Sequence, residues 1–220
     1  YMTDVNGILS PERTDLKDDQ ETWELCTITN AEGRTGGNAE AIKGTDVVIA
    51  LSAPGPGIIK QEWIRTMAEE PIVFACANPV PEIWPWEAKE AGARIVVTGR
   101  SDFPNQVNNS LGFPAIFRGA LDVRAKTITD EMCIAAAYAL ANFAEEKGLL
   151  KDDYLLPTME DWEAFPTEAA AVGVKAVEQG VARVERSYDD LYNMALNTIR
   201  EAQEMTQLLM REGYIAKAPK

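Results

Sequence analysis

The sequence contains no histidine, and this absence removes the commonest general base and the commonest transition-metal ligand. Any acid–base chemistry must therefore use carboxylates, tyrosine or lysine, or groups outside this chain. Basic residues are also scarce, since 21 Lys and Arg stand against 35 Asp and Glu, which gives a net charge of −14. Such an acidic chain argues against a nucleic-acid partner and against binding to an anionic membrane, because both attract a basic face.

Cysteines and long apolar runs are also few. The three cysteines, Cys26, Cys76 and Cys133, are odd in number and widely spaced, and Cys76 and Cys133 lie in apolar stretches. We therefore expect buried free thiols in a reducing cytoplasm rather than a disulfide framework. No apolar run approaches the roughly 20 residues of a membrane-spanning helix, and no basic-then-apolar leader stands at the start. Residues 1–4 begin inside what reads as a strand, so we expect a piece of a longer protein.

Three short apolar runs organise the first half of the chain. Residues 46–51, 71–77 and 94–97 are continuous and rich in β-branched side chains, and each run ends in a polar loop. This pattern is typical of parallel strands covered on both faces. The intervening segments 58–68 and 84–91 read as helices, so the rhythm predicts right-handed βαβ crossovers. We expect an α/β fold with a Rossmann-like open parallel sheet.

The remaining segments complete this expectation. Before the sheet we expect four short elements: the end of a strand at 2–4, a connector at 7–9, and helices near 18–25 and 39–43. The predicted sheet is thus incomplete in its N-terminal half. After Gly112 the chain turns helical, with three predicted helices at about 127–147, 166–181 and 188–212. We place a partial dinucleotide-binding domain at 1–184 and a helical extension at 185–220.

Neutral amides gather after the predicted strands. The run 98–119, TGRSDFPNQVNNSLGFPAIFRG, is dense in amide and hydroxyl side chains, and Asn78 follows the preceding strand. Ligands bind at such strand ends in open parallel sheets. The amides of Asn78, Asn108 and Asn109 suit a carboxylate or a carboxamide, and they orient a ligand without fixing a proton. The alternative is that these asparagines only cap loops.

Two further positions could contact a dinucleotide. Asp4, at the end of a second strand, could accept hydrogen bonds from an adenosine ribose, and the absence of a basic residue after it favours NAD over NADP. The loop from Ser52 to Gly57 could bring backbone close to a cofactor, with Gly55 removing the Cβ barrier. The alternatives are a plain polar strand end and a plain strand-to-helix turn. The fingerprint GxGxxG is absent, so the chain holds only part of a dinucleotide site.

Charged residues near these loops do not define a catalytic centre. Arg100 and Arg118 could bind a carboxylate or form structural ion pairs. Glu82, Asp102 and Asp122 carry oxygens that a divalent cation accepts, but their spacing shows no convincing cluster. We assign no catalytic residue and no metal ligand to this chain.

Four blocks carry a family resemblance. GTDVVIALSAPGPG, PIVFACANPVPEIWPWEA, GARIVVTGRSDFPNQVNNSLGFPAIFRGALDVRA and ITDEMCIAAAYALA, in this order, resemble the cofactor-binding domain of malic enzymes of the prokaryotic type, over about 4–183. The resemblance implies oxidative decarboxylation of L-malate to pyruvate and CO₂. It implies NAD or NADP as hydride acceptor and Mg²⁺ or Mn²⁺ as Lewis acid, and it implies substrate contacts for Asn78, Asn108 and Asn109. The cofactor contacts that it implies are Asp4, Ser52, Gly55 and Asn78.

The family's catalytic tyrosine and lysine, its acidic metal ligands and its glycine-rich turn lie in an upstream domain. We therefore expect this chain to need that domain as a partner, to be inactive alone, and to leave the metal mainly to residues outside it. The apolar stripe within 191–209 and the family's habit predict a dimer or larger homo-oligomer. The alternatives are a non-catalytic NAD(P)-binding or regulatory module and a malolactic-type decarboxylase.

Overall fold

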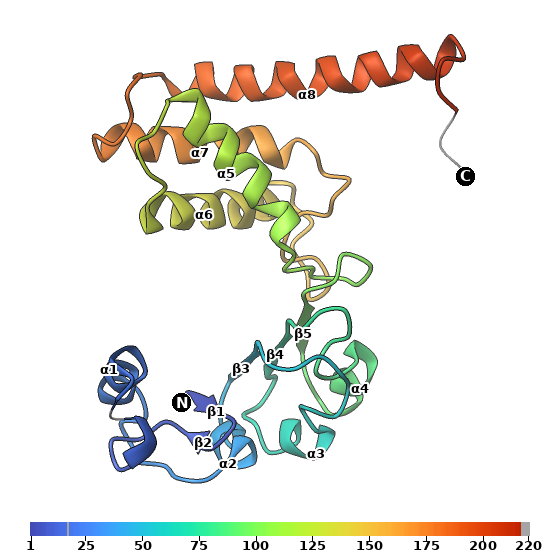
Figure 1. The fold of residues 1–220 in the computed structure, drawn as a ribbon. Helices are drawn as coiled ribbons and strands as arrows, with labels where there is room; N and C mark the ends of the chain where they lie inside the picture. The colour runs from blue at the N-terminus through green and yellow to red at the C-terminus, as the bar shows by residue number, and fades with distance from the viewer. Residues whose placement is uncertain (17, 217–220) are drawn as a thin grey trace. The chain divides into compact units, whose positions relative to one another are not determined.

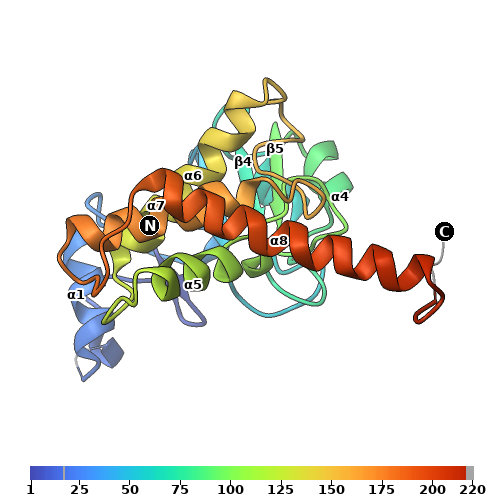
Figure 2. The ribbon, with the colours of Figure 1, turned by 90° about the horizontal axis from the view of Figure 1, so that it is seen from above.

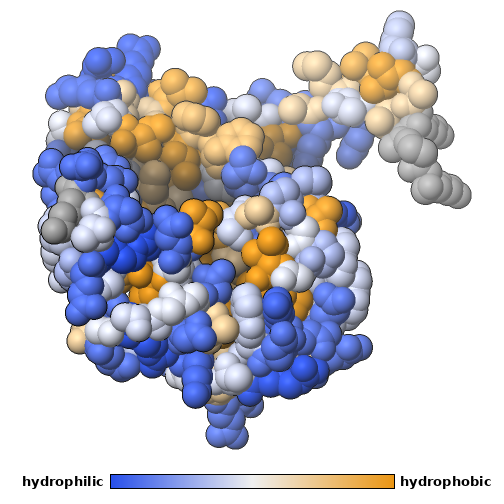
Figure 3. All heavy atoms as spheres, turned by 60° about the horizontal axis from the view of Figure 1, so that its bottom comes forward, coloured by the Kyte–Doolittle hydropathy of each residue, from blue (hydrophilic) through white to orange (hydrophobic). Residues whose placement is uncertain are grey.

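The computed structural model describes residues 1–16 and 18–216 of the chain (Figure 1). The chain divides into two compact units, Tyr1–Asn105 and Gln106–Lys220. Along the described residues, no helix combines the length and the apolar character needed to cross a membrane. Most of the surface drawn in Figure 3 is hydrophilic, as the acidic composition leads one to expect, with apolar patches between.

The first unit is built on a parallel sheet of three strands. β3 (Val47–Ala50), β4 (Ile72–Ala75) and β5 (Ile95–Thr98) lie in sequence order, with Val48 opposite Val73 and Val73 opposite Val96. The predicted α/β parallel sheet is therefore confirmed. The crossover helices are α3 (Gln61–Ile64) and α4 (Pro85–Glu90). α3 is shorter than the predicted 58–68, because the backbone just before it is bonded to the segment around Glu82 instead of forming a helical turn.

Apolar side chains from this sheet and its helices form the core of the first unit. Val73, Ala75, Ile64, Ile83 and Ala88 are at most 2 % exposed. β3 differs, because its side chains Val47, Ile49 and the following Leu51 are 44 %, 62 % and 78 % exposed. The prediction that all three strands are covered on both faces is thus wrong for β3, which is an edge strand of the described sheet.

Short elements precede the sheet. β1 (Thr3–Asp4) and β2 (Gly7–Ile8) form an antiparallel pair with Thr3 opposite Ile8. Gly7 has φ +112°, and a Cβ there would overlap the carbonyl oxygen of Gly36, so only glycine fits. The helical segments that follow are η1 (Thr14–Leu16), α1 (Gln20–Ile28) and α2 (Asn38–Ile42).

The second unit is helical, as predicted. It contains η2 (Asn109–Leu111), α5 (Phe113–Asp122), α6 (Asp130–Glu146), α7 (Ala164–Glu178) and α8 (Tyr188–Arg211). The Thr129 hydroxyl accepts from Met132 N–H at the start of α6, and Ser187 caps α8 in the same way, which explains where both helices begin. α7 contacts α5, α6 and α8. Figures 1 and 2 both show the C-terminal part of α8 extending past these helices.

Small residues let the helices of the second unit approach closely. A Cβ on Gly119 of α5 would overlap the carbonyl oxygen of Ala169 and lie 2.9 Å from Cβ of Val172, both on α7. Gly173 likewise faces the Leu191 side chain of α8, whose Cδ1 would lie 2.7 Å from an added Cβ. Contacts of this kind pack α7 tightly against its neighbours.

The cysteines are free, as expected, but they are not alike. Cys26 is buried and Cys76 is half-buried, whereas Cys133 is exposed. The prediction of a buried Cys133 is wrong, because an apolar run on a helix distributes its side chains around the whole helix, and Cys133 lies on the exposed side of α6 while its neighbour Met132 is buried.

Candidate functional site

The carboxyl ends of β3 and β4 are joined through one buried carboxylate. Glu82 is 0 % exposed, and its Oε1 accepts from Ser52 N–H at 2.9 Å and from the Ser52 hydroxyl at 3.3 Å. Its Oε2 accepts from Ala77 N–H at 3.0 Å. Ser52 follows β3 and Ala77 follows β4, so a single side chain connects the two loops at which a ligand of a parallel sheet would bind.

The end of β5 is joined to the same region by Asn78. Its Nδ2 donates to the carbonyl oxygen of Gly99 at 3.2 Å. A Cβ on Gly99 would overlap the carbonyl oxygen of Cys76 and lie 3.0 Å from Asn78 Nδ2, so the close approach needs glycine. Asn78 itself is exposed. Sequence reasoning missed both Gly99 and the linking role of Glu82. The sequence feature that could have indicated the role of Glu82 is an acidic residue placed among apolar residues and prolines.

The loop after β3 is open and needs its glycines. Gly55 and Gly57 have φ +130° and +95°, a region that side-chain-bearing residues rarely adopt, and no atom lies within 4 Å of an added Cβ at either position. Gly55 N–H donates to the carbonyl oxygen of Val80 at 3.1 Å. The loop therefore combines both interpretations of its sequence: its turn requires glycine, and its surface is free for a ligand to approach.

Asp4 is held by a bidentate ion pair. Arg13 Nη1 and Nη2 each donate to its carboxylate at 2.8 Å, and Asn6 N–H donates at 2.8 Å. The hydrogen bonds from Arg13 hold the pKa of Asp4 below its usual range. Asp15 accepts from the same guanidinium. An ionised carboxylate keeps acceptor capacity beyond these donors, so the ribose contact of Asp4 stays a prediction with a suitable acceptor in place.

The amides of the second unit surround η2. Asn108 is half-buried, and its Oδ1 accepts from Ser110 N–H at 3.0 Å and from the Ser110 hydroxyl at 2.8 Å, so it caps the short helix as the alternative interpretation expected. Asn109 is the first residue of η2 and is exposed. Gln106 is buried, and its Oε1 has no hydrogen-bond partner among the described atoms. These amides belong to the second unit and Asn78 to the first, so a shared substrate pocket stays a prediction.

The charged candidates have structural partners. Arg100 forms a bidentate pair with Asp102, and Arg118 pairs with Asp122 one turn along α5. Glu82 is occupied by amide donors. Among the described residues, no group of three or more Cys, Asp or Glu is placed to hold a metal ion. The oxygens of this part of the chain therefore do not fit a divalent cation site.

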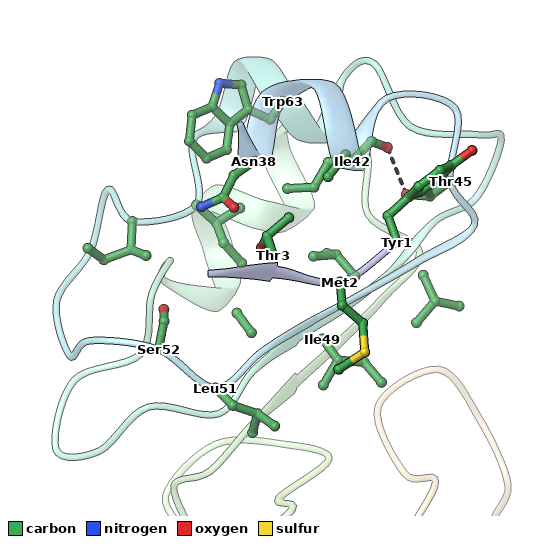
Figure 4. A pocket seen from close by; sticks show the side chains of 16 residues that line it. Tyr1, Met2, Thr3, Asn38, Ile42, Thr45, Ile49, Leu51, Ser52 and Trp63 are labelled. Atoms are coloured by element: carbon green, nitrogen blue, oxygen red, sulfur yellow. Dashed lines mark hydrogen bonds between the residues drawn. The ribbon is translucent and has the colours of Figure 1, made fainter. Parts of the chain in front are cut away.

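A groove of about 590 Å³ lies in the first unit between β1 and the outer edge of β3. Figure 4 shows Ile49, from β3, and the following Leu51 on one side of the strand that carries Thr3, and Trp63 on the other side. No charged side chain lines the groove. Its lining is mainly apolar, with the polar side chains of Thr3, Asn38, Thr45 and Ser52 among it, and it presents the edge of β3 that is unpaired in the described sheet.

Comparison with known proteins places this geometry in a family. The family model "Malic enzyme, NAD binding domain" matches residues 1–179. The "Bifunctional malic/malolactic enzyme" of Bacillus subtilis is 46 % identical over 183 residues, which are 83 % of this chain and 44 % of that protein. The "NADP-dependent malic enzyme" of Halomonas elongata is 44 % identical over 196 residues, with 83 % and 44 % covered.

The solved structures agree. The crystal structure of Entamoeba histolytica malic enzyme superposes with a TM-score of 0.93 at 52 % identity, over 99 % of this chain and 45 % of that one. The chain thus spans less than half the length of these relatives. A match over most of the chain, in sequence and in fold, shows that the chain belongs to the malic enzyme family and corresponds to its NAD-binding domain.

Proposed function

We propose that this chain is the NAD(P)- and substrate-binding part of a malic enzyme that converts L-malate to pyruvate and CO₂. The observation that carries the proposal is the linked set of strand ends, where Glu82 and Asn78 join the exits of β3, β4 and β5. Ligands bind at this edge of an open parallel sheet. The matching family model is named for NAD and the Halomonas elongata relative for NADP, so either dinucleotide fits the proposal.

In this proposal the chain's own residues bind and orient. Ser52 and Gly55 line the cofactor side, where the glycine loop allows close approach. The amide of Asn78 contacts the nicotinamide and the substrate, Asn108 and Asn109 contact the substrate, and Asp4 accepts from the ribose. Neutral amides and a backbone loop are not suited to move a proton. The acid–base pair and the divalent metal, which would act as a Lewis acid on the substrate, belong to the part of the enzyme outside this chain.

The groove beside β3 is the observation that supports the proposal that the remaining part of the enzyme is a partner of this chain. Ile72 N–H donates to Asp46 and Cys76 N–H donates to Ala50, so the even-numbered residues of β3 direct their backbone groups to β4. The N–H and C=O groups of Val47, Ile49 and Leu51 therefore face the opposite edge, into the apolar groove. An extended apolar strand from the rest of the enzyme would pair there. Natural proteins pair or cover an open hydrophobic strand edge of this kind.

Amide hydrogen exchange tests this partner. The probe is the part of the Bacillus subtilis relative that lies outside the matched segment. On binding it should slow exchange at Val47, Ile49 and Leu51 and leave the already paired Val48 and Ala50 unchanged. Ile49→Lys should weaken the complex, whereas Ile28→Lys, at an exposed apolar site on α1, should not. Slow exchange at these three amides in the isolated chain would instead point to pairing between copies of the chain.

Cofactor binding tests the proposed function itself. NADH fluorescence titrations of the complex between the chain and the unmatched part of the Bacillus subtilis relative should show saturable binding that Asn78→Ala weakens about tenfold, since a hydrogen bond to the ligand contributes about 1–1.5 kcal/mol. Asn193→Ala, at an exposed position on α8, is the matched control and should leave binding unchanged. Equal affinities for all three proteins would contradict the assignment of Asn78.

A malolactic activity is the second candidate, favoured by the name of the Bacillus subtilis relative. It would produce lactate rather than pyruvate from malate. Product analysis of the assembled enzyme separates the two. The chain is also proposed to work in the cytoplasm as a homo-oligomer, with the exposed apolar residues Met205 and Leu208 of α8 at the contact.

A further inference from the structure

Glu82 lies at the centre of the strand-end network, although no cofactor or substrate contact is assigned to it. The groups that bond its side chain are all donors: the N–H and hydroxyl of Ser52 and the N–H of Ala77. A fully buried carboxyl group surrounded in this way is matched by its ionised form, which only accepts. Its two oxygens are divided between two loops, with Oε1 at the exit of β3 and Oε2 at the exit of β4.

The main chain of residues 80–82 also bonds the C-terminal part of the loop that follows β3. The carbonyl oxygen of Glu82 accepts from Gly57 N–H and from Ile59 N–H, each at 3.1 Å, and Val80 accepts from Gly55 N–H at 3.1 Å. The loop after β3 is therefore attached to residues 80–82 along its whole length. Because both loops are bonded to this one segment, a change at Glu82 reaches both of them.

We propose that Glu82 is a positioning residue that holds the loops 52–57 and 77–79 in one arrangement, so that Ser52 and Asn78 meet the cofactor together. This inference rests on the proposed function, in which both residues contact the cofactor. Glu82 touches neither cofactor nor substrate. It acts through the N–H groups of Ser52 and Ala77, whose positions fix the directions of the neighbouring side chains.

Glu82→Gln tests the proposal with little change of volume. Glutamine has one acceptor oxygen, so its NH₂ group must face a donor on one of the two loops. We expect faster amide exchange at Ser52 or Ala77 and about tenfold weaker NADH binding, because one buried donor is left unpaired. Glu87→Gln is the matched control, because that carboxylate accepts from Trp84 N–H within its own helix. Unchanged exchange at both amides, or an equal loss in Glu87→Gln, would overturn the proposal.

Cys76 provides a second readout that reports the charge of Glu82. Burial and the negative charge of Glu82 raise the pKa of the Cys76 thiol. In Glu82→Gln the pH profile of alkylation by iodoacetamide at Cys76 should shift to lower pH, with the exposed Cys133 as internal standard. A general loosening of the fold would also expose Cys76 and lower its pKa, but it would speed alkylation of the buried Cys26 as well, whereas loss of the Glu82 charge acts on Cys76 alone. An unshifted profile would contradict an ionised Glu82.

The two proposals fail differently. If the complex of the wild-type chain with the unmatched part of the Bacillus subtilis relative binds no NADH, the proposed function fails, while amide exchange and alkylation still decide whether Glu82 holds the loops. If Glu82→Gln does not fold, Ser52→Ala carries the test, since it removes one donor and keeps the carboxylate. Faster exchange at Ala77 N–H in Ser52→Ala is then expected, and an unchanged rate at Ala77 would overturn the coupling of the loops.

Discussion

The two units of this chain are held together in different ways. The helices of the second unit close around α7, where Met132, Ala170, Val172 and Leu191 are at most 1 % exposed and glycines allow backbones to touch. The first unit has a thin sheet whose edge strand β3 leaves Ile49 and Leu51 mostly in solvent. Its strand ends are joined by polar side chains rather than by packing.

This difference indicates which unit is sensitive to substitution and which unit can bind a strand or a ligand. A close-packed helical unit loses stability when a side chain is enlarged at a tight contact, because its interior has little room to adjust. A sheet with an open edge and an open glycine loop tolerates change at its edge and can still accept a strand and a ligand there. Substitutions in each unit test this contrast, and the expected effects decrease from the first to the last.

The largest effect is expected at the contact of α5 and α7. Gly119→Ala would push a methyl group into the backbone of Ala169, so we expect a loss of about 3 kcal/mol in the free energy of unfolding, measured by urea denaturation. Gly112→Ala is the control, because an added Cβ there meets its nearest atom at an ordinary 3.6 Å. Equal stability of the two variants would show that the second unit is less tightly packed than described.

A smaller effect is expected at a buried acid in the same unit. Glu168 is 0 % exposed, neither oxygen has a partner among the described atoms, and burial raises its pKa to about 9 from an ordinary 4.5. The folded chain thus keeps a proton that the unfolded chain loses, so the free energy of unfolding falls as pH rises from about 4.5 to about 9.

Glu168→Gln removes this titration. We expect the variant to match the wild type near pH 5 and to exceed it by about 2–3 kcal/mol near pH 7, measured by urea denaturation at both pH values. Parallel curves for the two proteins across this range would mean that Glu168 ionises normally in the folded chain and that its surroundings are polar.

The smallest effects separate the inner and outer strands of the sheet. Val73→Ala, at a fully buried position in β4, should cost about 2 kcal/mol of unfolding free energy. Ile49→Lys, on β3, should change it by less than about 0.5 kcal/mol, because the side chain is already 62 % exposed. A large loss in Ile49→Lys, seen in the same thermal or urea melts, would mean that the edge of β3 is covered in the isolated chain.

Much of the fold could be predicted from local pattern. The three β-branched runs became β3, β4 and β5, and the capping residues Thr129 and Ser187 mark where α6 and α8 begin. What local pattern could not show was burial that depends on distant neighbours. The apolar run of β3 reads like that of β4, and only the pairing of strands shows which of them lies at the edge.

The candidate site was predictable to a similar degree. Asn78 and the loop at Ser52 lie at strand ends, as the sequence order of strands and polar loops required. The bridging role of Glu82 and the close approach at Gly99 depend on contacts between residues far apart in sequence, which no spacing rule predicts. The ribose role of Asp4 and the substrate roles of Asn108 and Asn109 remain predictions.

The most direct test of the proposed function is malate-dependent formation of NADH in the presence of Mn²⁺. The chain should be measured alone and after mixing with the unmatched part of the Bacillus subtilis relative. If the chain is the cofactor-binding part of a malic enzyme whose sheet is completed by a partner, neither component alone forms NADH and the mixture does. Turnover by the chain alone, or none from a mixture that mass measurement shows to be a complex, would contradict that function.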